Sequence, residues 1–147
     1  MEIKSLLVGK RVYVDTNILI YLFEGFPEYR HIIQKIADCI DNGEIILFTG
    51  EITIAEIMVM PFKKNDKNLI RLYTEALKNK DFITLIPTTQ EVYLKTAFLR
   101  ATFPKMKTPD SIQVASAIEG NTEIFITNDA SIKTPKELEK LVLKDFL

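Results

Sequence analysis

Val-Tyr-Val-Asp-Thr-Asn, residues 12–17, is a short apolar run that ends in an acid, Asp15. Such a run is typical of a buried strand. A second run of the same kind, Ile-Phe-Ile-Thr-Asn-Asp at residues 124–129, ends in Asp129. Strands buried on both faces occur in parallel sheets that helices cover on either side. The two segments therefore predict an α/β protein in which an acid follows each of two buried strands.

The rest of the chain alternates between helical and strand-like patterns. Thr108-Pro109 and Thr134-Pro135 each predict a helix start with threonine as the N-cap. We expect strands at residues 11–15, 45–48, 82–86, 123–127 and 141–143. We expect the main helices at residues 18–23, 28–41, 53–60, 66–80, 89–101 and 108–119.

This alternation predicts a three-layer α/β fold, in which a short, mostly parallel β-sheet is flanked by helices on both faces. The length of 147 residues indicates a single domain, residues 1–147. Sites in such sheets lie outside the carboxyl ends of the strands. Because Asp15 and Asp129 stand at two such ends, we expect both at one edge of the sheet.

Composition narrows the class of protein. Hydrophobic residues make up 47% of the chain and charged residues 27%, the balance of a soluble globular protein. No apolar run approaches the ~18 residues of a membrane span, and the N-terminus shows no signal-peptide pattern, so we expect a cytoplasmic protein. A single cysteine, Cys39, excludes an internal disulfide, and a single histidine, His31, argues against a catalytic triad. The net charge of −1 argues against binding long nucleic acid by charge alone.

Four acids stand where predicted elements begin or end. Besides Asp15 and Asp129, Glu56 lies one turn into the helix expected at 53–60, and Asp110 follows the Thr108-Pro109 helix start. Converging carboxylates repel one another unless a divalent cation lies between them. We therefore expect these four acids to be the metal ligands and the catalytic groups of a metal-dependent enzyme that acts on phosphates.

Each acid also has an ordinary interpretation. Asp15 suits a helix cap, and Glu56 follows Thr53 at the spacing of a capping box. The helix macrodipole favours Asp110 in a first turn, and Asp129 suits a loop turn. For all four interpretations to hold together, the sheet would need acids at two adjacent strand ends for no reason.

Mg²⁺ or Mn²⁺ suits such a site because both are hard ions that prefer oxygen ligands. Either ion lowers the pKa of a bound water and shields phosphate charge, so no histidine base is required. Four neighbouring polar residues are candidates to orient the carboxylates or their waters from behind: Thr16, Asn17, Thr127 and Asn128.

These motifs resemble the PIN domain family, and most of all the VapC toxins of bacterial and archaeal toxin–antitoxin pairs. Their order and spacing fit over nearly the whole chain, and the first and third motifs are the most specific. The matching segments are Val-Tyr-Val-Asp-Thr-Asn-Ile-Leu-Ile-Tyr-Leu-Phe (12–23), Thr-Ile-Ala-Glu-Ile-Met (53–58), Lys-Thr-Pro-Asp-Ser-Ile-Gln-Val-Ala-Ser-Ala (107–117) and Ile-Phe-Ile-Thr-Asn-Asp (124–129).

The resemblance implies a Mg²⁺- or Mn²⁺-dependent endoribonuclease that cuts single-stranded RNA or exposed RNA loops, leaving a 3′-hydroxyl and a 5′-phosphate. VapC toxins usually form homodimers and are silenced by a cognate antitoxin, often through its C-terminal tail. The four acids match the family's metal-site positions. Thr127 matches the hydroxyl residue before the last Asp, and Asn17 the small polar residue after the first.

The sequence departs from the family pattern in two places. Residues 128–132, Asn-Asp-Ala-Ser-Ile, lack the aromatic residue that many relatives place shortly after the last Asp, so the shape of this loop does not carry over. Residues 60–68 are rich in lysine, and family members vary there, so the identity of the RNA does not carry over.

Basic and apolar segments add candidate contact surfaces. Arg100, Lys105 and Lys107 precede Asp110 and are our candidates for RNA binding, with a solvated surface as the ordinary alternative. A second basic cluster follows Glu56: Lys63, Lys64, Lys67 and Arg71. Apolar residues at 57–62 suit a dimer or antitoxin groove, although core packing is the better expectation for Ile57, Met58 and Val59. The helix at 89–101 offers two alternative inner stripes: Val92, Tyr93, Ala97 and Leu99, or Leu94 and Phe98.

Two other functions stay open. One is a PIN-fold module that has lost catalysis and binds RNA or protein, against which the intact acids argue. The other is a phosphoryl-transfer enzyme or receiver on a similar sheet. The phosphoryl-transfer enzyme would need a second Asp two residues after Asp15, where Asn17 stands. A receiver would need an acidic pair at the first strand.

Overall fold

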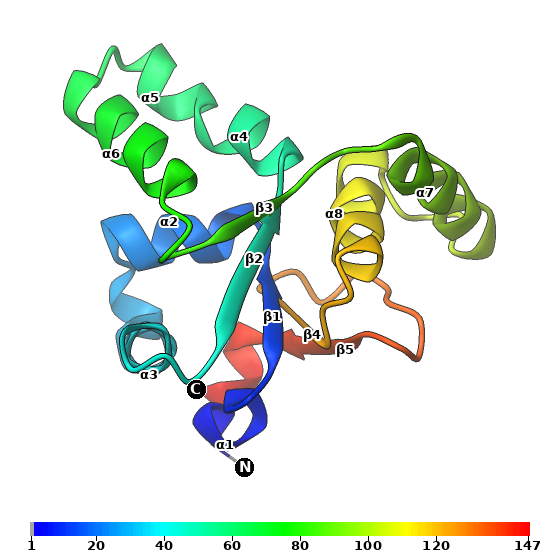
Figure 1. Ribbon diagram of the computed structural model, residues 1–147, viewed down its shortest axis with the longest axis horizontal. Helices are drawn as coiled ribbons and strands as arrows, with labels where there is room; N and C mark the ends of the chain where they lie inside the picture. Colours follow the sequence, from blue (N-terminus) through cyan, green and yellow to red (C-terminus); the bar gives the residue numbers. More distant parts are fainter. Residues whose placement is uncertain (1) are drawn as a thin grey trace.

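The computed structural model describes residues 2–147, and these form a β-sheet between two groups of helices (Figure 1). The five strands are β1 (Arg11–Val14), β2 (Ile46–Gly50), β3 (Thr84–Ile86), β4 (Ile124–Thr127) and β5 (Glu139–Val142). The helices within the described residues are α1 (Ile3–Leu7), α2 (Thr16–Glu24), α3 (Arg30–Asp41), α4 (Ile52–Ile57), α5 (Val59–Lys63), α6 (Lys67–Lys78), α7 (Gln90–Thr102) and α8 (Thr108–Glu119), with the 3₁₀ turns η1 (Pro27–Tyr29) and η2 (Leu143–Phe146).

The strands lie in the order β3-β2-β1-β4-β5, and every neighbouring pair is parallel. β1 is the central strand, with Tyr13 opposite Phe48 of β2 and Phe125 of β4. The carboxyl ends of the strands therefore share one edge, as the sequence predicted for β1 and β4. The expected mostly parallel sheet is confirmed and is fully parallel.

Alternate side chains of each strand enter different cores. Val12 and Val14 pack with α2 and α3, whereas Tyr13 packs with α7 and α8 on the other face. Tyr13 also stacks on Phe125, with ring centroids 5.3 Å apart. A register slip of one residue would exchange the side chains of the two cores, so burial on both faces fixes the register. The predicted three-layer fold is confirmed.

Several local predictions were wrong. Thr134-Pro135 does not start a helix, because Leu138 is buried in the second core and the chain pairs at once with β4 as strand β5. Thr108 is the first residue of α8 rather than its cap, and Lys107 takes the cap position. Pro61 lies in the first turn of α5, where a missing N–H costs little, so the helical path continues beyond residue 60.

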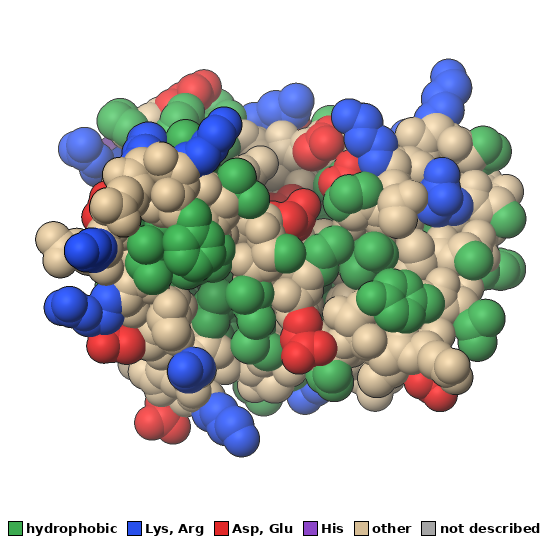
Figure 2. Space-filling view, turned by 90° about the horizontal axis from the view of Figure 1, so that it is seen from above, with side chains coloured by type: hydrophobic (Ala, Val, Ile, Leu, Met, Phe, Trp, Pro, Cys, Tyr) green, Lys and Arg blue, Asp and Glu red, His purple; other side chains and the backbone are tan. Residues whose placement is uncertain are grey.

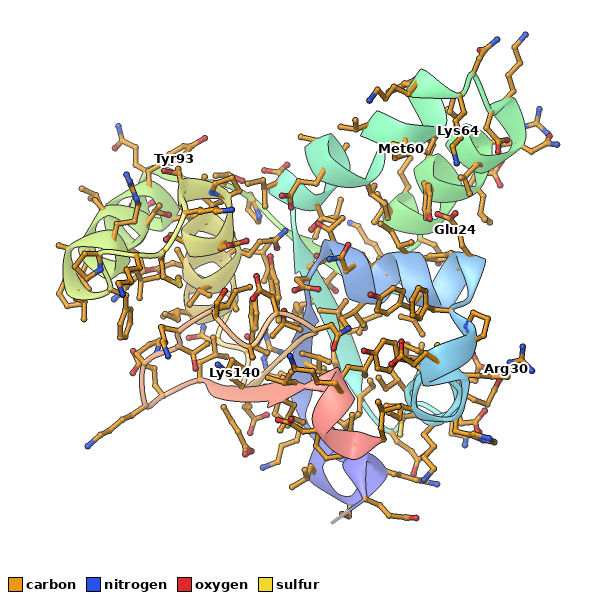
Figure 3. All side chains as sticks on the ribbon, turned by 180° about the vertical axis from the view of Figure 1, so that it is seen from behind. Glu24, Arg30, Met60, Lys64, Tyr93 and Lys140 are labelled. Atoms are coloured by element: carbon orange, nitrogen blue, oxygen red, sulfur yellow. The ribbon has the colours of Figure 1, made fainter. Side chains whose placement is uncertain are left out.

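Helices α4, α5 and α6 form an arm that extends away from the sheet (Figure 1). The hydroxyl of Tyr73 on α6 donates a hydrogen bond to Glu24 and so ties the arm to the body. Glu24 lies at the end of α2 and is labelled in Figure 3. Ile57 and Met58 are buried as expected, whereas Val59 is 52% exposed, contrary to its predicted place in the core.

Helix α7 presents an apolar outer face. Its inner stripe is Val92, Thr96 and Leu99, which matches neither alternative in full. Leu94 and Phe98 are 71% and 61% exposed, so the second alternative was wrong. Among the helices of residues 2–147, none has the length and apolar character needed to cross a membrane.

Candidate functional site

Asp15 lies at the point where β1 gives way to α2. Its backbone N–H donates to the carbonyl oxygen of Ile126 at 3.2 Å, which extends the β1–β4 pairing to the edge of the sheet. Its side chain accepts a hydrogen bond from the N–H of Ile18 at 3.3 Å and so caps α2. The helix-cap interpretation is confirmed, but capping uses one oxygen only. The residue is 7% exposed, which places a carboxylate at the floor of the site.

Glu56 projects from α4 toward the same edge. Its Oε1 accepts hydrogen bonds from Thr16 Oγ1 at 2.8 Å and from Gln113 Nε2 at 2.7 Å. The capping-box interpretation is wrong, because Thr53 shares a 2.7 Å hydrogen bond with Thr49 instead of capping the helix. Two donors from α2 and α8 therefore hold Glu56, and tertiary contacts explain its position.

Asp110 and Asp129 complete the group of acids. Asp110 lies in the first turn of α8, as expected. Asp129 follows β4, where its Oδ1 accepts hydrogen bonds from the N–H and the hydroxyl of Ser131 at 2.9 and 2.6 Å. The turn interpretation of Asp129 is thus also confirmed. The side chain is exposed and remains accessible at the edge of the sheet.

Two adjoining cavities connect the acids. Asp15, Glu56 and Asp110 line a cavity of about 220 Å³ together with Thr16 and Asn17. Asp110 and Asp129 line a larger cavity of about 610 Å³, so Asp110 belongs to both. Figure 2 shows acidic side chains in the middle of this face, between the arm and the α7–α8 pair. Three of the predicted acids thus share one cavity, and the fourth adjoins it.

The electrostatics of Asp15 reflect a buried, crowded carboxylate. Burial raises the pKa of Asp15 to about 7, and the negative charges of Asp110 and Glu56 contribute to the rise. The Thr127 hydroxyl and the Ile18 N–H act in the opposite direction. At neutral pH this carboxyl is therefore only partly ionised unless positive charge enters the site.

The two outer acids differ from each other. Burial, followed by the charges of Asp129 and Glu56, raises the pKa of Asp110, while Lys107 lowers it. Hydrogen bonding from Ser131, above all from its hydroxyl, holds the pKa of Asp129 below its usual range. Of these two acids, Asp129 therefore stays ionised more readily, and Lys107 lies close enough to influence the pKa of both.

The donor set of the site fits a hard divalent cation. It consists of carboxylate oxygens with neighbouring hydroxyl and amide oxygens, and their mutual repulsion is the kind that a dication relieves. Within residues 2–147, however, no three His, Cys, Asp or Glu side chains are arranged closely enough to hold a metal ion as they stand. Metal binding by Asp15, Glu56, Asp110 and Asp129 therefore stays a prediction.

Two of the polar residues expected to support the acids lie at the site, and a third makes its hydrogen bond elsewhere. Asn17 lines the smaller cavity, and the buried Thr127 accepts a hydrogen bond from the N–H of Asp129 at 3.0 Å. Asn128 lines neither cavity, and its Oδ1 accepts a hydrogen bond from the N–H of Lys144 at 3.3 Å. Thr127 is placed to orient Asp15 and Asp129, whereas Asn128 joins the residue after β4 to η2.

Some of the basic residues predicted to bind RNA line the larger cavity, and others do not. Lys105 and Lys107 line the larger cavity, while Arg100 is exposed one turn earlier on α7 and lines neither cavity. The second basic cluster lies exposed on the arm: Lys63, Lys64, Lys67 and Arg71. Lys105 and Lys107 are therefore the predicted cations that lie nearest to the acids.

Gln113 was not foreseen, although it connects the site to the sheet. Its Nε2 donates to Glu56 at 2.7 Å and to Thr16 at 3.1 Å, while its Oε1 accepts from the Tyr13 hydroxyl. The Tyr13 hydroxyl in turn accepts from the N–H of Gly50 at 2.8 Å. A polar residue three positions after Asp110, on an otherwise apolar helix face, was the available signal.

Replacing Gln113 with leucine is expected to destabilise the fold by about 1–3 kcal/mol. The variant leaves the Tyr13 hydroxyl without its acceptor and Glu56 without one of its donors. Urea unfolding measures the effect. Gln90→Leu, at the exposed start of α7, is the matched control and should leave the stability unchanged. Equal stability of the two variants would show that the hydrogen bonds of Gln113 do not stabilise the fold.

Comparisons with known proteins agree with this fold. A toxin–antitoxin complex from Klebsiella pneumoniae contains a chain that is 24% identical, covering 86% of this chain and 94% of that one, with a TM-score of 0.60. VapBC2 from Rickettsia felis, bound to a DNA fragment from its promoter, contains a chain 14% identical, covering 89% and 97%, with a TM-score of 0.65. A search of curated proteins found no significant match. The family model of the PIN domain matches residues 12–138, and the protein therefore belongs to the PIN domain family.

Proposed function

We propose that this protein is a Mg²⁺- or Mn²⁺-dependent endoribonuclease that hydrolyses RNA phosphodiester bonds, and that it is the toxin of a type II toxin–antitoxin pair. One observation carries the proposal. In a PIN domain, Asp15, Glu56 and Asp110 line a single cavity at the carboxyl edge of the sheet, and Asp129 adjoins it. Few groups other than a divalent cation reconcile so many carboxylates with a phosphate substrate.

The residues of the chain have separate tasks in this reaction. When bound, the ion lowers the pKa of water and neutralises phosphate charge. The four acids Asp15, Glu56, Asp110 and Asp129 would supply the oxygen ligands. Thr16 and Gln113 hold Glu56 in place. Lys107, whose charge influences Asp110 and Asp129, is placed to attract the phosphate.

Exposed apolar surfaces support protein partners. Tyr93, Leu94 and Phe98 form an uncovered face on α7, and Val59, Met60 and Phe62 form another on the arm. Among the similar solved structures, one is described as a toxin–antitoxin complex and another as VapBC2 bound to a DNA fragment from its promoter. We assign these surfaces to a homodimer contact and to a cognate antitoxin.

The proposal is tested with the purified protein, an unstructured fluorescent RNA and a DNA of the same sequence. Millimolar Mg²⁺ or Mn²⁺ is expected to give RNA cleavage, with products that carry a 5′-phosphate and a 3′-hydroxyl. EDTA should abolish the cleavage, and the DNA should stay intact. RNA cleavage that persists in EDTA, or its absence with either ion, would contradict the proposal.

A catalytically inactive module that binds RNA or protein is the alternative. It is favoured by the fact that, in residues 2–147, the acids are not drawn together at metal-binding distances. Calorimetric titration with Mn²⁺ separates the two functions. Heat of binding that disappears in a variant of Asp15 supports the nuclease, and no binding at millimolar ion supports the inactive module.

A further inference from the structure

We infer that the larger cavity beside the acids binds one nucleobase of the RNA strand whose backbone crosses the acidic site. The inference rests on the proposed RNA cleavage and adds to it a pocket for one base. The pocket combines apolar residues with lysines: Phe103, Pro104, Lys105, Met106, Lys107 and Lys133.

The position of the cavity links it to the acids. Asp110 lines both the larger cavity and the smaller acidic one, and Asp129 stands in the wall of the larger one. A volume of about 610 Å³ lies within the range of pockets that enclose small organic ligands, roughly 300–1,000 Å³. A nucleotide whose phosphate lies at the acids would therefore have space for its base in the adjoining larger cavity.

The apolar part of the cavity suits the flat face of a base. Phe103 ends α7 with its ring half-buried, and Pro104 follows it directly. Met106 is buried, and the sulfur of methionine makes favourable contacts with aromatic rings. Proteins that bind single-stranded nucleic acid commonly stack bases on such aromatic side chains.

The walls of the cavity are held in place by hydrogen bonds. The N–H of Lys133 donates to the sulfur of Met106 at 3.1 Å, which joins the two sides of the cavity. Lys140 on β5 donates through Nζ to the carbonyl oxygens of Ile132 at 2.7 Å and Ala130 at 3.1 Å (Figure 3). A cavity fixed in this way requires little ordering when a ligand enters.

Charge favours RNA over a peptide as the occupant. Three lysines, Lys105, Lys107 and Lys133, line the cavity against two carboxylates, Asp110 and Asp129, and the charge of Lys107 reaches both acids. An apolar peptide segment would gain nothing from three cations around an apolar floor. A polyanion with flat apolar bases uses both features, since the lysines meet phosphates and the ring meets the base.

The test uses fluorescent RNA octanucleotides that each carry one abasic position, with anisotropy as the measure of binding. Ca²⁺ takes the place of Mg²⁺, because it accepts the same kind of oxygen ligands, and a gel shows that the RNA stays intact. One abasic position is expected to weaken binding about fivefold to a hundredfold, the range for one stacked base. Phe103→Leu keeps an apolar side chain but removes the ring. In this variant, an abasic site at that position should weaken binding no more than an abasic site elsewhere.

Phe26→Leu is the matched control, because Phe26 is an exposed phenylalanine that lies outside both cavities and outside the two apolar faces assigned to partners. It should keep the abasic profile of the unchanged protein. RNA cleavage together with a flat profile would overturn the base pocket and leave the nuclease intact. An abasic profile that depends on Phe103, without RNA cleavage in any ion, would support the base pocket and overturn the nuclease. A profile unchanged in Phe103→Leu, with a protein partner lost instead, would assign the cavity to that partner and overturn the inference.

Discussion

Asp15→Asn is expected to lower RNA cleavage at least a hundredfold and, in EDTA, to raise the melting temperature by roughly 5–10 °C. The loss of activity follows from the removal of one of the carboxylates proposed to bind the metal. The gain in stability follows from its burial, which raises the pKa of Asp15 from 3.8 to about 7. Ionising that carboxyl in the folded protein therefore costs up to about 4 kcal/mol, and asparagine avoids the cost.

The side chain of asparagine preserves the local structure. Its oxygen accepts the same hydrogen bond from the N–H of Ile18 that caps α2, so the helix start is retained. Asp81→Asn, in an exposed loop far from the cavities, is the matched control and should alter neither quantity. Scanning calorimetry in EDTA and the cleavage assay measure both effects. A variant of Asp15 that is less stable than the parent at about pH 8 would contradict this account.

The stability of the metal-free protein is expected to fall as the pH rises from about 4 to about 7. In this window the folded protein retains a proton on Asp15 that the unfolded chain has released, so the free energy of unfolding decreases. Bound Mn²⁺ should reverse the trend, because it binds the ionised carboxylates of the folded state. At one hundred times its dissociation constant, the ion would add about 2.7 kcal/mol.

Melting curves in EDTA and in millimolar Mn²⁺, at about pH 5 and about pH 8, measure this coupling. The increase in melting temperature with the ion should be several degrees at the higher pH and small at the lower one. Asp15→Asn serves as the control and should remove most of the pH dependence. An ion-induced increase of equal size at both values would show that Asp15 does not titrate with metal binding.

The sheet and its acidic edge were predictable because the signals were local. A buried parallel strand is a short apolar run, and Asp15 and Asp129 follow two such runs directly. The ordinary interpretations of these acids also proved correct, because Asp15 caps α2 and Asp129 forms a turn with Ser131. One carboxylate is able to serve a local hydrogen bond and still face a cavity, so the two kinds of interpretation did not exclude each other.

The remaining features depend on contacts between distant segments. Gln113 meets Glu56 across 57 positions of sequence and Tyr13 across 100, and no local pattern encodes those distances. Thr134-Pro135 carries a good helix-start signal, but pairing of the following residues with β4 prevails. The exposure of Leu94 and Phe98 could not be predicted either, because an apolar stripe on α7 is compatible with burial until its neighbours are known.

The central place of β1 has a consequence for the order of synthesis. Its residues pair with β2 early in the chain but with β4 only after residue 124, so one side of the first strand stays open until then. Partners this far apart in sequence assemble late and slowly. A nascent chain in which β4 has not yet been synthesised lacks both Asp129 and the strand that aligns Asp15. For the ribonuclease that we propose, this topology postpones assembly of the site until residues 124–129 have been synthesised.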